Sequence, residues 1–190
     1  DVLPWFRKLE HHWRGETPCH GGSGPLSVEP HPAPSPLMAK AIDAARSLGF
    51  PITEDFNGAR TDGFGMPDFT IRNGRRCSAA DAYLDPALSR PNLEVRTGAL
   101  VEKVLIENGR ATGVRYRQDG DTIEVAANAE VILCGGAINS PHMLMLSGIG
   151  PGAQLREHGI DVIADSPEVG ANLTDHPGAG MEFDLDPSLA

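Results

Sequence analysis

The chain from Val131 to Gly150 has the sequence Val-Ile-Leu-Cys-Gly-Gly-Ala-Ile-Asn-Ser-Pro-His-Met-Leu-Met-Leu-Ser-Gly-Ile-Gly. This stretch is the strongest indication of the fold. Residues 131–134 form an unbroken apolar run, which is typical of a strand buried on both faces in a parallel sheet. Gly135 and Gly136 then permit a sharp turn and let a ligand or a second segment approach the backbone closely. The stretch therefore predicts a buried strand that ends in a glycine turn.

A helix is expected to follow this turn. Ser140 can supply an N-cap oxygen, and Pro141 suits the first helical position, where its missing N–H costs nothing. The residues from Met143 to Leu146 are apolar all round, which predicts a buried helix, and Gly148 lies where a C-terminal cap is expected. Strand, turn and helix form half of a dinucleotide-binding crossover, whose helix N-terminus and bare backbone amides suit a pyrophosphate.

Two runs in this part of the chain resemble signatures of one enzyme family. Gly136-Ala137-Ile138-Asn139-Ser140-Pro141, continued by Ser147-Gly148-Ile149-Gly150-Pro151, is similar to the second signature of the glucose-methanol-choline (GMC) flavoprotein oxidoreductases. Val169-Gly170-Ala171-Asn172-Leu173-Thr174-Asp175-His176 resembles the family's VGxNLxDH element at its usual distance. The resemblance covers nearly the whole chain. It begins with Asp1-Val2-Leu3-Pro4-Trp5-Phe6, which is similar to the DVLPYF stretch of choline-dehydrogenase-like members.

The resemblance implies a mixed fold of class α/β (α+β). It predicts part of a Rossmann-like FAD-binding domain with a β-meander, and part of an antiparallel-sheet substrate domain. Residues 1–84 would give helices and a hairpin to the substrate side, and residues 85–177 a partial FAD-binding domain. Residues 178–190 would start the return to the substrate domain, with a new strand near Met181.

Local patterns predict four more helices. Asp1 is a plausible N-cap for a helix whose apolar stripe extends from Val2 to Trp13. Ser35 and Pro36 open a second, core-facing helix that Gly49 closes. The remaining two are a helix over 78–84, by resemblance to the family, and a short helix around Leu155 that ends at His158 and Gly159.

Strand patterns and turn residues predict the remaining sheet structure. Asn73-Gly74 indicates a hairpin with a type I′ turn, and Asn108-Gly109 and Asp119-Gly120 indicate two more. The glycine-rich run from His20 to Gly24 is interpreted as a turn entering a strand, with no ligand assigned. The remaining strands are expected at 93–96, 100–106, 111–117 and 122–126, which together make a meander, and at 160–164.

By the resemblance, FAD is the cofactor and a small-molecule primary alcohol is the substrate. The family's members contact the adenine through the backbone at the position that matches Val101, where residue identity matters little. The cofactor-binding residues that the resemblance implies are Val101, Gly135, Gly136, Ala137, Ser140, Asn172, Asp175 and His176.

No catalytic residue is assigned in this chain. The family's catalytic histidine and its His or Asn partner lie near the C-terminus of the enzyme, and neither they nor the N-terminal G-x-G-x-x-G unit occurs in this sequence. The parent enzyme would oxidise the alcohol to an aldehyde and pass hydride to the flavin, whereas the isolated chain is expected to bind FAD weakly or not at all and to be inactive. An oxidase or a flavin-containing lyase of the same family remains an alternative, and the motifs favour the choline-dehydrogenase-like subgroup.

A different class of function is also open. The chain could be a non-catalytic scaffold, or a fragment that complements the remaining segments of the same enzyme. Apolar surface on the 143–146 helix and the 131–134 strand would then be covered by a partner chain.

Two histidine constellations invite chemical roles. His11, His12, Cys19 and His20 could suggest zinc, but their spacing fits no tetrahedral site, so solvated side chains and no metal are expected. His176 follows Asp175 and could suggest a general base, yet a structural or cofactor-proximal role is favoured.

Bulk properties exclude several classes of partner. The formal net charge of −10 argues against binding nucleic acid or an anionic membrane surface. No apolar run reaches about 18 residues and no leader is visible, so neither a transmembrane segment nor secretion is expected. Three widely spaced cysteines do not resemble a disulfide framework, which makes a cytoplasmic location the default expectation.

Overall fold

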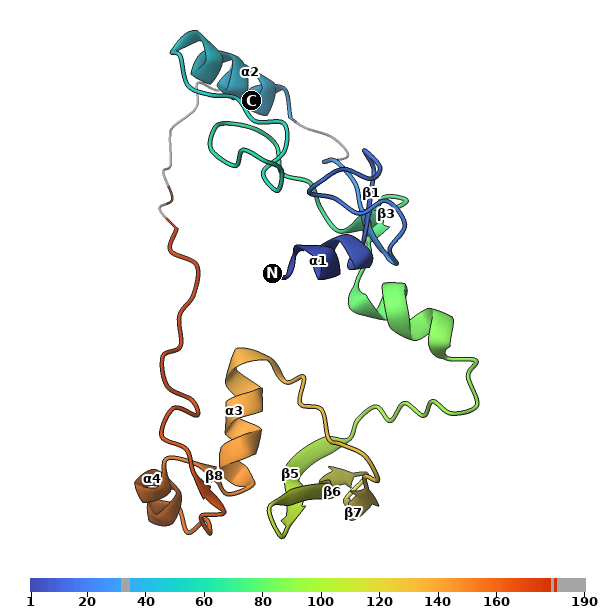
Figure 1. Ribbon diagram of the computed structural model, residues 1–190, viewed down its shortest axis with the longest axis vertical. Coiled ribbons are helices and arrows are strands. Elements are labelled where there is room, and N and C mark those ends of the chain that lie inside the picture. The colour runs from blue at the N-terminus through green and yellow to red at the C-terminus, as the bar shows by residue number, and fades with distance from the viewer. Residues whose placement is uncertain (32–34, 179, 181–190) are drawn as a thin grey trace. The chain divides into compact units, whose positions relative to one another are not determined.

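The chain is divided into two compact units, which are described separately. The computed structural model describes residues 1–31, 35–178 and 180 (Figure 1). The first unit is built on Asp1–Glu94 and the second on Val95–Met181. No helix among the described residues has the length and apolar character that crossing a membrane requires. The strand predicted near Met181 lies outside the described residues.

The first unit combines short helices with two small sheets. Strand β1 pairs with β2 in parallel, and β3 with β4 in an antiparallel hairpin whose turn residues, Asn73 and Gly74, have φ of 53° and 74°. This confirms the type I′ hairpin. The elements are α1 (Leu3–Leu9), β1 (Glu10–His12), β2 (Leu26–Val28), α2 (Pro36–Ser47), β3 (Ile71–Arg72), β4 (Arg75–Arg76), the π-helix η1 (Ala80–Leu84) and the 3-10 helix η2 (Asp85–Ala87).

Side chains that precede α1 and α2 accept hydrogen bonds from the first turn of each helix. Ser35 is the N-cap of α2 as predicted, whereas the cap position of α1 is Val2, one residue after the predicted Asp1. Asp1 Oδ1 accepts a hydrogen bond from the Leu3 N–H (3.1 Å), and Ser35 Oγ accepts one from the Met38 N–H (3.2 Å). Helix α1 ends at Leu9, because Glu10 turns to extended backbone, so Trp13 is not part of its stripe. The core-facing character predicted for α2 is wrong. Ala45 is its one buried residue, because the described chain offers little for the other apolar side chains to pack against.

The glycine-rich run after His20 is a turn that enters β2, as predicted, and the structure shows that it is tightly packed. A Cβ atom added at Gly21 would lie 1.8 Å from the Arg7 carbonyl oxygen, and one added at Gly24 would lie 2.2 Å from the Leu9 carbonyl carbon. These glycines therefore let the run pass directly against the backbone of α1, where no side chain fits.

A three-stranded meander dominates the second unit. It consists of β5 (Leu100–Glu107), β6 (Arg110–Gln118) and β7 (Asp121–Ala126), in the order β5-β6-β7 with antiparallel pairing. Positive φ at Asn108 and Gly109, and again at Asp119 and Gly120, confirms both predicted turns. The strand predicted at 93–96 is wrong, because this segment is exposed and pairs with no described strand.

Helix α3 (Gly136–Leu146) starts earlier than predicted. Pro141 is inside the helix, and Ser140 is not the N-cap but accepts a hydrogen bond from the Gly135 N–H through its Oγ (3.0 Å). The predicted burial of this helix is also wrong, since none of its residues is buried. Gly148, with φ of 86°, follows the helix as the predicted C-terminal cap.

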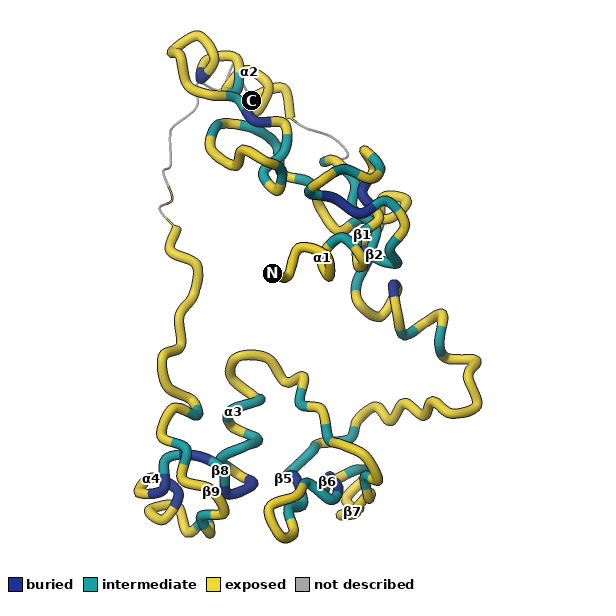
Figure 2. The backbone as a smooth tube through the Cα atoms, viewed as in Figure 1, coloured by how far each residue is buried: buried dark blue, intermediate teal, exposed yellow. Residues whose placement is uncertain are grey.

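The predicted buried strand at 131–134 is not formed. The segment pairs with no strand among the described residues, and its side chains alternate between half-buried and exposed. Ile132 is 73% exposed and Cys134 is exposed. Figure 2 shows the segment that leads into α3 in teal and yellow, the colours of half-buried and exposed residues. A strand buried on both faces needs a neighbour on each side, and the described chain provides none here.

The remaining elements close the second unit. Helix α4 (Gly152–Glu157) ends at His158 and Gly159 as predicted, with φ of 70° at the glycine. Strands β8 (Ile149–Gly150) and β9 (Ala164–Asp165) pair in parallel, so the strand predicted at 160–164 is shorter and shifted towards the C-terminus. The buried apolar residues of the described chain are few: Ala45, Cys77 and Ala82 in the first unit, and Val104, Tyr116 and Leu155 in the second.

Candidate cofactor site

The N-terminus of α3 carries the predicted glycine turn. Gly136 adopts φ of 77° and has no atom within 4 Å of the place where a Cβ would lie, so the turn faces open space. The N-cap residue Gly135 offers no side chain to the first-turn N–H groups. These amides, together with the positive end of the helix dipole, form a site suited to an anionic group.

Two cavities flank this helix start. One of about 230 Å³ is lined by Val101, Gly135 and Ser140, together with apolar residues of β5, β6 and segment 131–134. The other, of about 670 Å³, is lined by Ala137 and Asn172, with further residues of α3 and the 170–174 loop. Five of the eight predicted cofactor residues therefore line these cavities, namely Val101, Gly135, Ala137, Ser140 and Asn172. Gly136 lies between Gly135 and Ala137 in the chain.

Asp175 and His176 are not brought to either cavity. Both are exposed, and the His176 N–H donates to Asp175 Oδ1 at 2.7 Å, which is a local contact between neighbours. Asn172, at a positive φ of 56°, donates from its side-chain amide to Glu168 Oε2 at 2.9 Å and so fixes the loop. An acid–base pair at 175–176 is not formed.

The residues present fit a phosphate-bearing cofactor such as FAD. In a chain of net charge −10, neither cavity beside α3 is lined by an acidic side chain. The glycine turn leaves backbone amides accessible, and the apolar walls suit a flat aromatic ring.

Sequence reasoning missed the role of Ser147. Its buried hydroxyl accepts a hydrogen bond from the Val104 N–H (2.8 Å) and donates to the Met143 carbonyl oxygen (2.6 Å). It thereby joins the outer edge of β5 to the last turn of α3. No sequence pattern links Ser147 to Val104, which is 43 residues away.

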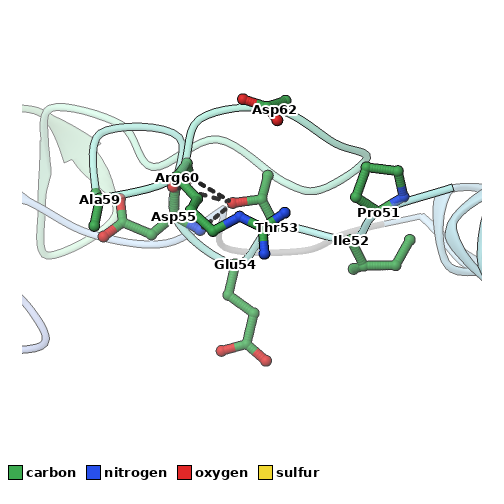
Figure 3. A pocket seen from close by; sticks show the side chains of 9 residues that line it. Pro51, Ile52, Thr53, Glu54, Asp55, Ala59, Arg60 and Asp62 are labelled. Atoms are coloured by element: carbon green, nitrogen blue, oxygen red, sulfur yellow. Dashed lines mark hydrogen bonds between the residues drawn. The ribbon is translucent and has the colours of Figure 1, made fainter.

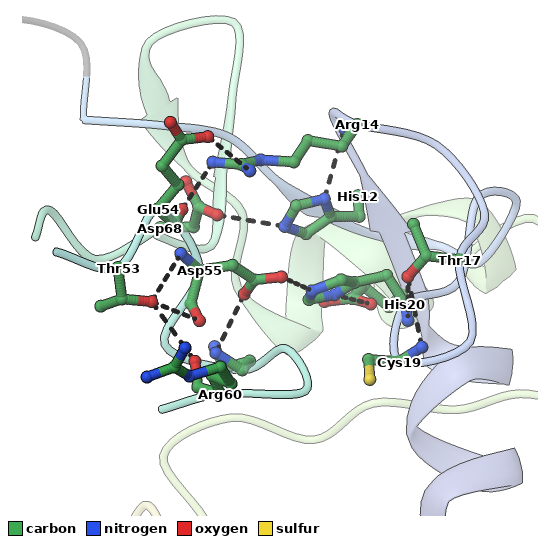
Figure 4. A network of polar contacts seen from close by, with 12 residues as sticks. His12, Arg14, Thr17, Cys19, His20, Thr53, Glu54, Asp55, Arg60 and Asp68 are labelled. Carbon is green, nitrogen blue, oxygen red and sulfur yellow. Dashed lines mark hydrogen bonds and ion pairs between the residues drawn. The ribbon is translucent and has the colours of Figure 1, made fainter. Parts of the chain in front are cut away.

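The expectation of solvated histidines is wrong for His12 and His20. These side chains are buried, and their rings stack with centroids 3.8 Å apart and planes inclined by 24° (Figure 4). They bond to carboxylates far away in sequence, His20 to Asp55 and His12 to Asp68. This separation explains why no spacing pattern indicated the cluster.

Glu10, His12 and His20 bring potential metal-ligand atoms within 4.8 Å of one another. However, a histidine nitrogen binds a metal ion through a lone pair that lies in the plane of its ring. The rings of His12 and His20 are stacked nearly parallel, so one ion cannot lie in both ring planes and bind to both histidines. Both nitrogens of His20 and the Nε2 of His12 already contact carboxylates. Hydrogen bonding accounts for this cluster, and the prediction of no metal is kept as a prediction.

Comparison with known proteins identifies the family. The family described as GMC oxidoreductase matches residues 1–178. Oxygen-dependent choline dehydrogenases from Sinorhizobium medicae (strain WSM419) and Rhizobium meliloti (strain 1021) are 51% and 50% identical over 183 residues, which is 96% of this chain and 32% of each relative. The chain thus spans about a third of the length of these relatives.

Solved structures agree in fold. Pyridoxine 4-oxidase from Mesorbium loti superposes with a TM-score of 0.80 at 37% identity, over 88% of this chain and 33% of that one. An FAD-dependent oxidoreductase from Chaetomium thermophilum gives 0.78 at 30% identity, over 87% of this chain and 31% of that one. With its mixed α/β fold and both sequence signatures, the chain belongs to the GMC oxidoreductase family and is choline-dehydrogenase-like.

Proposed function

We propose that this chain supplies part of the FAD-binding domain and part of the substrate side of an FAD-dependent alcohol oxidoreductase. GMC family members bind FAD, and the observation that carries the proposal here is the open glycine turn at the start of α3. In the bound state, FAD supplies a ring that accepts hydride from the alcohol carbon.

The residues of this chain would bind and orient the cofactor. The first-turn amides of α3 would hold a negatively charged or electron-rich group, while Asn172 would keep the 170–174 loop beside it. The backbone of Val101 would contact the adenine. Asp175 and His176 stay in the proposal as cofactor-proximal residues, without a share in proton transfer.

A primary alcohol is the proposed substrate class, and choline is the first compound to test because the relatives above are choline dehydrogenases. The proposed function is that of a longer protein, since the chain spans about a third of these relatives. The isolated chain is proposed to be inactive. A cytoplasmic location is also proposed, on the wide spacing of the three cysteines.

A scaffold or complementing fragment is the second candidate. Its support is the exposed apolar surface beside the glycine turn, where Ile132 and Ile138 are 73% and 71% exposed. A scaffold would bind a partner chain through this surface and carry no flavin, whereas a complementing fragment would bind the remaining segments of the same enzyme there.

A carboxylate placed at the turn tests the proposed cofactor site. Ala137→Asp, in the protein that contains this chain, should lower the ratio of flavin to protein, because the new charge competes for the amides that the cofactor needs. Ala153→Asp is the matched control: Ala153 is also exposed and is also the second residue of its helix, α4. An unchanged flavin ratio in Ala137→Asp would overturn the proposed site, and a protein that carries no flavin at all would favour the scaffold.

A further inference from the structure

The loop of residues 51–65 lies against the start of the chain through polar contacts. Its two ends are tied to each other, since the Thr53 N–H donates to the Phe64 carbonyl and the Phe64 N–H to the Pro51 carbonyl, both at 2.9 Å. Within 51–65, Thr53 alone is buried, and the loop surrounds an open cavity of about 460 Å³ (Figure 3). Apolar packing therefore contributes little to holding this loop.

His20 makes the buried contact that holds it. The ring is 3% exposed, and its Nδ1 lies 2.9 Å from Glu10 Oε2 while its Nε2 lies 2.9 Å from Asp55 Oδ2. Ionised carboxylates only accept hydrogen bonds, so both ring nitrogens must carry protons. The geometry thus describes an imidazolium between two carboxylates.

Each carboxylate is fixed from a second direction. Glu10 Oε2 also accepts from the Gly21 N–H, and Asp55 Oδ1 accepts from the Asn57 N–H, both at 2.9 Å. Glu10, His20 and Asp55 are called the His20 clasp below. The clasp joins β1 to the 51–65 loop.

His12 needs no positive charge. Its Nδ1 accepts from the Arg14 N–H (3.3 Å) and its Nε2 faces Asp68 Oδ2 (3.1 Å), which one ring proton on Nε2 satisfies. If the His12 ring is neutral, His20 is the single cation in this buried stacked pair, and no repulsion arises between two positively charged rings.

The other charged groups around the clasp carry both signs. Asp68 faces its stacked partner, and the Arg7 Nε donates to the His20 carbonyl oxygen while the Arg7 side chain pairs with Glu16. Burial opposes the charge on His20, but the hydrogen bonds to Asp55 and Glu10 and their negative charges outweigh it. The pKa of His20 is therefore raised above the ordinary value of 6.5.

We propose that His20 is a buried imidazolium that clasps the 51–65 loop to β1, and that loss of its proton releases the loop. A neutral His20 has one N–H, so one of the two carboxylates loses its partner and remains charged at a partly buried position. Among the described residues, the other hydrogen-bonded link from the loop to this region is the more exposed pair of Arg14 with Glu54, where Arg14 donates to the Glu54 carbonyl oxygen at 2.6 Å.

Hydrogen exchange as a function of pH tests the clasp. Protection of peptides covering 51–65, corrected for the intrinsic rate, should be constant on the acid side of the His20 pKa. Above that pKa, the protection of these peptides should fall by up to about tenfold for each pH unit, because the fraction of molecules with a charged His20 falls by the same factor. His20→Gln should show low, pH-independent protection of the loop, whereas His11→Gln, at an exposed histidine of β1, should behave like the unsubstituted protein.

Ring nitrogen spectra of the unsubstituted protein give an independent readout if His20→Gln fails to fold. At pH 6.5 both nitrogens of His20 should carry protons in more than half of the molecules, because each nitrogen contacts a carboxylate and the pKa of the ring is raised above that value. A neutral His20 ring at that pH, or loop protection that does not change as the ring titrates, would overturn the proposal.

Discussion

Replacing Ser147 with alanine is predicted to destabilise the second unit. The substitution removes the acceptor of the Val104 N–H, and Val104 is 6% exposed, so water cannot reach the orphaned donor. It also removes the hydroxyl that donates to the Met143 carbonyl at 2.6 Å. Leaving one buried backbone donor without a partner costs about 1–3 kcal/mol.

This magnitude translates into a measurable change in melting temperature. For a unit of this size, each kcal/mol shifts Tm by about 4–8 °C, so Ser147→Ala should lower the Tm of the second unit by roughly 4–24 °C. Circular dichroism follows the loss of the β5–β6–β7 sheet. Amide exchange at Val104 reports the broken bond directly, and it should accelerate more than exchange at the neighbouring residues of β5.

Ser166→Ala is the matched control for this experiment. The Ser166 hydroxyl has no hydrogen-bond partner among the described residues, although its backbone N–H donates to the Gly150 carbonyl at 2.9 Å. Its Tm should therefore stay close to that of the unsubstituted protein. If Ser147→Ala melts at the same temperature as Ser166→Ala and Val104 remains protected, the hydroxyl does not anchor α3 to β5.

The remaining predictions concern two glycines of the first unit and the pH dependence of its stability. Gly21→Ala should prevent the first unit from folding, because its Cβ would lie 1.8 Å from the Arg7 carbonyl oxygen; Gly49→Ala, where φ is 81° but space is open, should cost only about 1–2 kcal/mol. Urea titration checks this: the first unit should show no unfolding transition in Gly21→Ala and a slightly lowered midpoint in Gly49→Ala, and similar midpoints in the two variants would contradict it. Stability of the first unit should fall on both sides of a pH plateau. The pKa of His20 is raised, so its contribution is complete below 6.5 and is lost as pH rises through the folded-state pKa. Burial raises the pKa of Asp55, but the hydrogen bonds from His20 and the Asn57 N–H and the charges of His20 and Arg14 lower it overall. The Asp55 contribution is thus present above 3.8 and is lost as pH falls through its folded-state pKa. His20→Gln should flatten the alkaline side of the unfolding profile, and an unchanged slope there would exclude the clasp as its cause.

Elements specified by a few adjacent residues could be predicted from the sequence. The pairs Asn73-Gly74, Asn108-Gly109 and Asp119-Gly120 each take positive φ at both positions, because this turn type requires that conformation and these residues tolerate it. Ser35 as an N-cap and Gly148 as a C-terminal cap follow from the same kind of local chemistry.

Features that depend on distant partners could not be predicted. The apolar run at 131–134 has the composition of a buried strand, but a strand forms only where neighbouring strands accept its hydrogen bonds. The burial of His12 and His20 depends on Asp68 and Asp55, which are 56 and 35 residues away. The Ser140-Pro141 pair predicted that α3 starts at Pro141. In the structure Ser140 lies inside the helix, and its Oγ accepts a hydrogen bond from the Gly135 N–H.

The cofactor site stays a prediction, although the structure brings together some of the residues predicted for it. Gly135, Ala137 and Ser140 line the cavities beside α3 because they belong to the start of this helix, and Val101 and Asn172 line the same cavities from β5 and the 170–174 loop. Asp175 and His176 follow Asn172 in sequence but extend away from the cavity as exposed backbone. Their contribution to a cofactor site stays a prediction.

Flavin binding and alcohol oxidation can be tested together in the visible absorbance spectrum of the purified protein that contains this chain, recorded without oxygen before and after addition of choline. We predict oxidised flavin bands in the protein as purified, and their bleaching by choline or another primary alcohol as hydride reaches the flavin. A protein that shows no flavin bands even after purification with FAD, or a bound flavin that no alcohol reduces, would contradict this prediction.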